Sequence, residues 1–248
     1  MNKVFEEQIQ RYLVFRWLKK NYFSGLLVCL LAFGSGGLSY FFVFSGFDLV
    51  TILSQPLAEV SVILQLSYFV VFLLGISIPI SIGSVRFFLV GLQGKKWKVK
   101  DLLFAFRFTH YWRGMFIEGV RHLLVITIVL VPVSAFIFLG ARQSELNWFI
   151  LFTVACVTPI YYKYRFTTYV FNQHPNLGFM KTFKSSANLT DGIKWRLFVV
   201  DLSFVALFFG GSHFFGLGSL LIAPYYEAFM ARYYLDLLSD RPWVQTWR

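Results

Sequence analysis

The chain has 248 residues, of which 57% are hydrophobic and only 14% are charged. Roughly a quarter of the residues in a soluble domain are charged. So few polar residues, with a mean hydropathy of +0.63, exclude a water-soluble globule. A net charge of +11 would indicate a nucleic-acid partner in a soluble protein. Here the basic residues gather between apolar runs, which predicts a membrane protein without a nucleic-acid partner.

The apolar runs are long enough to cross a membrane. A membrane-spanning helix needs about 20 apolar residues, because the hydrocarbon core is roughly 30 Å thick. The predicted fold class is therefore all-α, a polytopic membrane protein with six transmembrane helices in a single membrane domain, residues 1–248. The predicted spans are 22–44, 62–85, 122–141, 146–170, 197–212 and 216–235.

The last two spans depend on a fold-back of the chain. The apolar stretch from Trp195 to Leu238 would measure about 65 Å as one helix, roughly twice the hydrocarbon thickness. The glycine-rich residues 210–218 favour a turn within this stretch. A single helix is the alternative, and it would give five spans.

The distribution of basic residues decides between five and six spans. Six spans place 22 of the 23 Lys and Arg residues on the side of both termini, and only Arg142 on the other side. Cytoplasmic loops carry the excess of Lys and Arg. We therefore expect six spans in the cytoplasmic membrane, with the N- and C-termini in the cytoplasm.

Three cytoplasmic segments, 4–20, 99–116 and 176–189, combine apolar and basic residues at helical spacing. Their apolar sides are predicted to face lipid, and they include Tyr12 and Trp17 in the first segment and Phe183 in the third. Helices of this kind lie at the membrane surface and attract anionic lipid. We expect membrane lipids, anionic on the cytoplasmic side, as partners. A membrane-protein partner that docks on these helices is the alternative, and the oligomeric state is left open.

A charge within a predicted span is costly and therefore informative, and four such residues are singled out. Glu227 lies near the middle of the sixth span, and Asp201 lies about one turn inside the fifth. Lys163 and Arg165 lie toward the cytoplasmic end of the fourth. A cluster of the four could be a structural ion-pair network or a path for a substrate, a proton or a lipid headgroup.

Motifs for catalysis and metal binding are missing from the sequence. It contains no phosphate-binding loop and no G-x-S-x-G nucleophile turn. The four histidines lack ligand spacing, and the two cysteines lie in apolar runs without a C-x-x-C pair. We therefore expect no catalytic residue, no cofactor and no metal, and the chain is predicted not to be an enzyme.

The C-terminal third carries an ordered series of short motifs. They are Lys184-Ser185-Ser186, Gly192 to Phe198, Asp201 to Phe204, Gly216-Leu217-Gly218, Pro224-Tyr225 and Phe229. Over residues 160–238 this order resembles the bacterial membrane family called domain of unknown function 975. Over residues 1–120 the resemblance rests on the pattern of spans and on Lys20 to Tyr22.

This resemblance implies a multi-pass membrane protein of a Gram-positive bacterium. It implies no reaction, because the family has no agreed biochemical activity, so no catalytic residue is carried over. Family members often have a Trp soon after the Leu-Ser-Phe motif, whereas Val205-Ala206-Leu207 follows it here.

The leading functional hypothesis is a non-enzymatic accessory or scaffold that acts through lipid or protein contacts. The alternative is a small transporter, or a peptide-export or immunity component, that uses Glu227 and its neighbours. A membrane enzyme acting on lipid is a third possibility.

Overall fold

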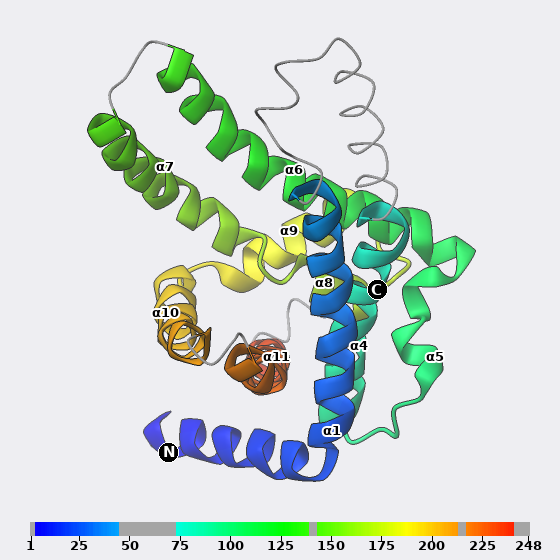
Figure 1. The fold of residues 1–248 in the computed structure, drawn as a ribbon. Helices are drawn as coiled ribbons and strands as arrows, with labels where there is room; N and C mark the ends of the chain where they lie inside the picture. The colour runs from blue at the N-terminus through cyan, green and yellow to red at the C-terminus, as the bar shows by residue number, and fades with distance from the viewer. Residues whose placement is uncertain (1–2, 45–72, 139–142, 213–216, 241–248) are drawn as a thin grey trace. The chain divides into compact units, whose positions relative to one another are not determined.

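The structure is a computed structural model that describes residues 3–44, 73–138, 143–212 and 217–240 (Figure 1). Every regular element in these ranges is helical, which confirms the all-α class. The chain forms two compact units, one of residues 1–115 and 207–233 and the other of residues 116–206 and 234–248. Residues 62–72 of the predicted second span, and Arg142, lie outside the described ranges.

The first unit begins with α1 (Lys3–Phe44), a single helix of 42 residues. The sequence predicted a surface helix over 4–20 and a separate span over 22–44, so the structure joins two predicted elements. No proline or glycine interrupts this junction before Gly25. The side chain of Asn21 donates to the carbonyl of Trp17 at 3.0 Å and follows the helical path. Figure 1 shows that α1 nevertheless bends, so that its N-terminal arm and its second arm point in different directions.

The elements that follow α1 are η1 (Leu73–Ser77), α4 (Ile78–Leu92), α5 (Val99–Leu102), η2 (Phe104–Phe106) and α6 (Phe108–Phe138). Helix α4 packs against α1 and against the three short elements η1, α5 and η2. Two glycines in α4 let its neighbours approach closely. A Cβ at Gly83 would collide with the Leu102 carbonyl of α5, and one at Gly91 would collide with the Trp17 ring of α1.

The predicted surface helix over 99–116 is wrong. The structure divides this segment into α5, η2 and the start of α6. Asp101 begins the first piece by accepting a hydrogen bond from the backbone N–H of Lys98 at 2.9 Å. The chain then turns so that Phe104 is buried, and the extended backbone of Arg107 separates η2 from α6. Burial of an aromatic ring therefore outweighs the helical periodicity on which the prediction rested.

The second unit contains most of α6, which α7 (Gln143–Lys163) follows in the opposite direction (Figure 1). The next elements are α8 (Thr167–Gln173), α9 (Phe179–Thr190) and α10 (Lys194–Ser212). Three buried aromatic rings pack against one another in this unit. Phe166, Tyr169 and Tyr234 lie with ring centroids 5.3 to 5.5 Å apart in all three pairs.

Helix α9 occupies most of the segment predicted as a surface helix over 176–189, but it packs on the protein. Its buried residues are Thr182, Phe183, Ser185, Ser186, Leu189 and Thr190. Phe183, which the sequence placed on the lipid-facing side, is buried next to Phe179 and Tyr164. The Ser186 and Thr190 hydroxyls donate to the carbonyl of Lys163 at 3.3 and 3.1 Å, so α9 caps the end of α7.

Helix α10 ends before the expected fold-back, and α11 (Leu217–Asp240) begins after it. Their backbones come close within the first unit. A Cβ at Gly211 would lie 2.7 Å from the carbonyl carbon of Gly218, and one at Gly218 would lie 2.6 Å from Gly211. Ser219 adds a hydrogen bond of 3.1 Å to the carbonyl of Phe208. Only glycine allows this approach.

Within the described residues, one helical stretch is long and apolar enough to cross a membrane. It runs from Gly75 to Leu92 with a mean hydropathy of 1.7, and 61% of it is buried in the protein. A buried core helix of a soluble protein would satisfy the same criteria. The six spans therefore stay a prediction.

Candidate functional site

Glu118 of α6 is the most deeply buried charged side chain among the described residues, with 2% of its surface exposed. Arg121 Nε donates to Glu118 Oε2 at 3.1 Å, and Arg121 Nη2 donates to Oε1 at 2.5 Å. Thr168 Oγ1 of α8 donates to the same Oε2 at 2.8 Å. Both carboxylate oxygens are thus held by donors, as a buried charge requires.

The helical spacing of α6 and α8 builds this network. Arg121 lies three residues after Glu118 and therefore on the same side of α6. His122 Nδ1 donates to the carbonyl of Glu118 at 2.8 Å, which places a proton on that ring nitrogen. On α8 the side chain of Asn172 donates to the carbonyl of Thr168 at 3.0 Å, four residues earlier. We call these five residues the Glu118 network.

Two opposing effects set the charge state of Glu118. Burial raises the pKa of a carboxyl group, because it disfavours the ionised form. The charges of Arg121 and His122, with hydrogen bonds from Thr168 and Arg121, outweigh burial and hold the pKa of Glu118 below its usual range. Glu118 is therefore ionised at neutral pH and serves as an anchor between α6 and α8 rather than as a proton acceptor.

A second group of interacting side chains lies in the first unit. The guanidinium of Arg86 lies 3.9 Å from the ring centroid of Phe104, and its Nε lies 3.6 Å from Asp101 Oδ1. The His110 ring stacks on the same phenyl ring at 4.6 Å, and its buried Nδ1 has no hydrogen-bond partner among the described residues. Burial, with the charges of Arg107, Arg86 and Arg113, lowers the pKa of His110.

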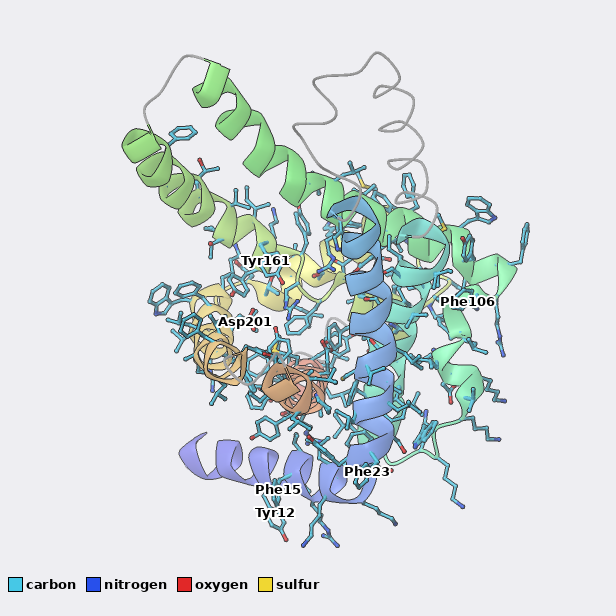
Figure 2. The ribbon with its side chains drawn as sticks, viewed as in Figure 1. Tyr12, Phe15, Phe23, Phe106, Tyr161 and Asp201 are labelled. Atoms are coloured by element: carbon cyan, nitrogen blue, oxygen red, sulfur yellow. The ribbon has the colours of Figure 1, made fainter. Side chains whose placement is uncertain are left out.

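Of the four charged residues singled out in the sequence, Asp201 has a tyrosine partner. Tyr162 of α7 donates to Asp201 Oδ2 of α10 at 3.0 Å, and both belong to the second unit. Figure 2 shows Asp201 on α10 and Tyr161, the neighbour of Tyr162, on α7. Asp201 therefore accepts a hydrogen bond that joins two helices.

Lys163 and Arg165 also contact tyrosines. Arg165 Nη1 donates to the Tyr161 hydroxyl at 2.8 Å, and its guanidinium lies 5.5 Å from the same ring centroid. Lys163 Nζ lies 5.6 Å from the ring centroid of Tyr164. Basic side chains among tyrosines are typical of the interface between membrane and water.

Glu227 belongs to the first unit and the other three residues to the second, so the cluster of four stays a prediction. Its surroundings there include α1. Glu227 is half-buried on α11, within electrostatic range of the Cys29 thiol. Nearby, the hydroxyl of Tyr22 donates to the carbonyl of Leu221 at 2.9 Å, and Gly25 faces Pro224.

A family model with the description "Protein of unknown function (DUF975)" matches residues 18–241. The chain belongs to this family. The match includes most of each compact unit and all the residues of the two charged groups described above. No curated protein and no solved structure matches the chain. The DUF975 family model carries no described activity, so the function rests on the chain's own residues.

The Glu118 network of this DUF975 member was not predicted from the sequence. Arg121 was counted only for the orientation of the spans, and Glu118 lies just before the predicted third span, where a charge is unremarkable. The available signal was the spacing Glu-x-x-Arg-His, which places a base three residues after an acid on one helical face. Burial of the carboxylate depends on Thr168, fifty residues away, and no local pattern reports it.

Proposed function

We propose that the chain is a six-span protein of the cytoplasmic membrane, with both termini in the cytoplasm, that acts as a non-enzymatic accessory or scaffold. The observation that carries this proposal is the exposed side of α10. Val199, Leu202, Val205 and Phe209 of this helix are 47 to 69% exposed. Exposed apolar surfaces of this kind mark contacts with a membrane or with another protein.

Helix α1 supports the same conclusion. Phe23, Leu27 and Leu30 on one face are 47 to 84% exposed, whereas Val28 and Cys29 are buried. A helix that is apolar on all sides needs an apolar environment all round. Lipid tails provide this environment without a specific partner, because they are as apolar as leucine.

The non-enzymatic part of the proposal rests on how the polar groups between the helices are used. The Glu118 carboxylate accepts three hydrogen bonds within the protein, and Asp201 accepts one from Tyr162. The Ser186 and Thr190 hydroxyls hold the end of α7. Such groups connect helices, as a scaffold requires. The excess of cytoplasmic Lys and Arg would bind anionic lipid on that side.

Single-cysteine labelling tests the topology. In a Cys29→Ala, Cys156→Ala background, a membrane-impermeant maleimide should label Gln143→Cys in intact cells. It should label Lys95→Cys and Lys181→Cys only after the cells are opened, because these exposed lysines are assigned to the cytoplasm. Labelling of either lysine position in intact cells, or recovery of the protein in the soluble fraction after an alkaline wash, would refute the proposal.

The scaffold role is tested by purification in a mild detergent. A stoichiometric protein or lipid partner, together with no solute flux in proteoliposomes, is the expected result. A small transporter is the second candidate, because Glu227 is a half-buried acid on the apolar helix α11. Flux that disappears in Glu227→Gln, but persists in the exposed control Asp240→Asn, would replace the scaffold by the transporter.

A further inference from the structure

The N-terminal arm of α1 has one face fixed against the protein. The ring of Trp17 packs edge-on against Phe87 and Phe88 of α4, with centroids 5.9 and 6.0 Å apart. Val14 and Leu18 are buried on the same side, with 1% and 4% of their surface exposed. The sequence placed Trp17 together with Tyr12 on the lipid-facing side, whereas the structure turns Trp17 inward.

The opposite face of this arm combines aromatic and basic side chains. Its exposed residues are Tyr12, Phe15, Arg16, Lys19, Lys20 and Phe23. Tyr12 and Phe15 are 62% and 60% exposed, and Figure 2 shows both pointing away from the neighbouring helices. Tyr12, Lys19 and Phe23 recur at intervals of seven and four residues, so they lie on one side of the helix.

A second basic segment lies at the same end of α4. After this helix the chain turns at Gly94, whose φ of +76° suits glycine. Trp97 then packs against Phe87 with centroids 4.8 Å apart. Phe87 therefore contacts tryptophans from two segments that lie eighty residues apart in the sequence. The exposed residues that Trp97 brings with it are Lys95, Lys96 and Lys98.

We propose that these two segments form one binding surface for the headgroups of anionic phospholipids. The basic–aromatic surface consists of Tyr12, Phe15, Arg16, Lys19, Lys20, Lys95, Lys96 and Lys98. The inference rests on the proposed membrane location, which puts the surface at the headgroup level, next to the first span. Aromatic rings prefer that level. Six basic side chains there complement anionic lipid, and Asp101, the acid next to this loop, is paired with Arg86.

Photo-crosslinking in the full-length protein identifies what occupies the surface. Phe15→benzoylphenylalanine is activated in nanodiscs of phosphatidylcholine with 30% phosphatidylglycerol and, separately, in intact cells, and the adducts are weighed. The expected adduct is phosphatidylglycerol, in excess of its share of the bilayer. Each Lys or Arg near a membrane surface favours anionic lipid about fivefold. Arg16→Gln/Lys19→Gln/Lys20→Gln and Lys95→Gln/Lys96→Gln/Lys98→Gln should therefore each lower the excess by at least tenfold.

Two controls separate the possible failures. Lys181→Gln/Lys184→Gln/Lys194→Gln removes as many charges from the other compact unit and should leave the adduct unchanged. Phe209→benzoylphenylalanine on α10 should crosslink both lipids in proportion to their amounts. One set of outcomes overturns this inference alone. In it, Phe209→benzoylphenylalanine crosslinks lipid, while the Phe15 position crosslinks protein, crosslinks nucleic acid or shows no preference between the lipids. The absence of lipid adducts at both positions overturns the proposed function as well. If Lys95→Gln/Lys96→Gln/Lys98→Gln leaves the phosphatidylglycerol adduct at Phe15 unchanged, the two segments do not form one surface.

Discussion

Thr168 of α8 donates a hydrogen bond of 2.8 Å to the buried carboxylate of Glu118 on α6. The two residues are fifty positions apart, and their contact joins helices that the sequence describes only separately. Arg121 supplies the opposite charge from the same helix as Glu118. Thr168 thus completes the set of donors around a charge with 2% of its surface exposed.

Glu118→Gln should lower the free energy of unfolding by about 3–5 kcal/mol, because it removes one partner of a buried ion pair and leaves Arg121 without its counter-charge. Thr168→Val should cost about 1–3 kcal/mol, since the carboxylate then loses a donor. Ser239→Ala, at an exposed hydroxyl, is the control and should change stability by less than about 0.5 kcal/mol. Denaturant titration in detergent measures all three, and an unchanged midpoint for Glu118→Gln would show that the pair is not structural.

The lowered pKa of His110 predicts that the protein loses stability in mild acid. The pKa of its imidazole lies below the ordinary value of 6.5 in the folded protein, because of burial and three neighbouring arginines. The unfolded chain therefore binds the proton at a higher pH than the folded chain. Stability is full above pH 6.5 and falls as the pH drops from there through the folded-state pKa. In melting temperatures measured between pH 8 and pH 5, His110→Phe should flatten this decrease. The exposed His174→Gln should retain it, and an unchanged slope in His110→Phe would assign the effect to other groups.

Two adjacent glycines of α10 give a matched test of the close approach between helices. Gly211→Ala should lower the free energy of unfolding by about 1–3 kcal/mol. The new Cβ would collide with the backbone of Gly218, which cannot rotate away as a side chain could. Gly210 has open space at the same position, so Gly210→Ala should instead stabilise the helix by about 0.5–1 kcal/mol. Melting temperatures of the two variants should therefore move in opposite directions. Equal shifts would mean that α10 and α11 do not touch there.

Tyr162→Phe tests whether Asp201 has a structural role. Loss of the phenolic donor should lower the free energy of unfolding by about 1.5–3 kcal/mol, which is the range for a hydrogen bond to a charged group. Tyr12→Phe, which removes an exposed hydroxyl, is the control and should have little effect. Unfolding in detergent measures both. If Tyr162→Phe leaves stability unchanged, Asp201 becomes a stronger candidate for a functional charge.

Several features of the helices could be read from local sequence alone. The all-α class follows from long apolar runs that only helices can satisfy internally. The glycine-rich residues 210–218 predicted two helices here, and α10 ends at Ser212 while α11 begins at Leu217. Membership of the family could likewise be inferred from the motif order over residues 160–238, and the family match over residues 18–241 confirms it.

The tertiary structure alone decided which side of each helix faces the protein. Periodicity placed Trp17 and Phe183 on lipid-facing sides. In the structure the half-buried Trp17 ring packs over Gly91, which has no Cβ to collide with it. Phe183 is buried in contact with Phe179 and Tyr164. In the same way, Glu118 became a buried charge only through Thr168. Sequence determines that a residue is apolar or charged and where a helix can form. Burial depends on partners that lie far apart along the chain, and only the packed fold brings them together.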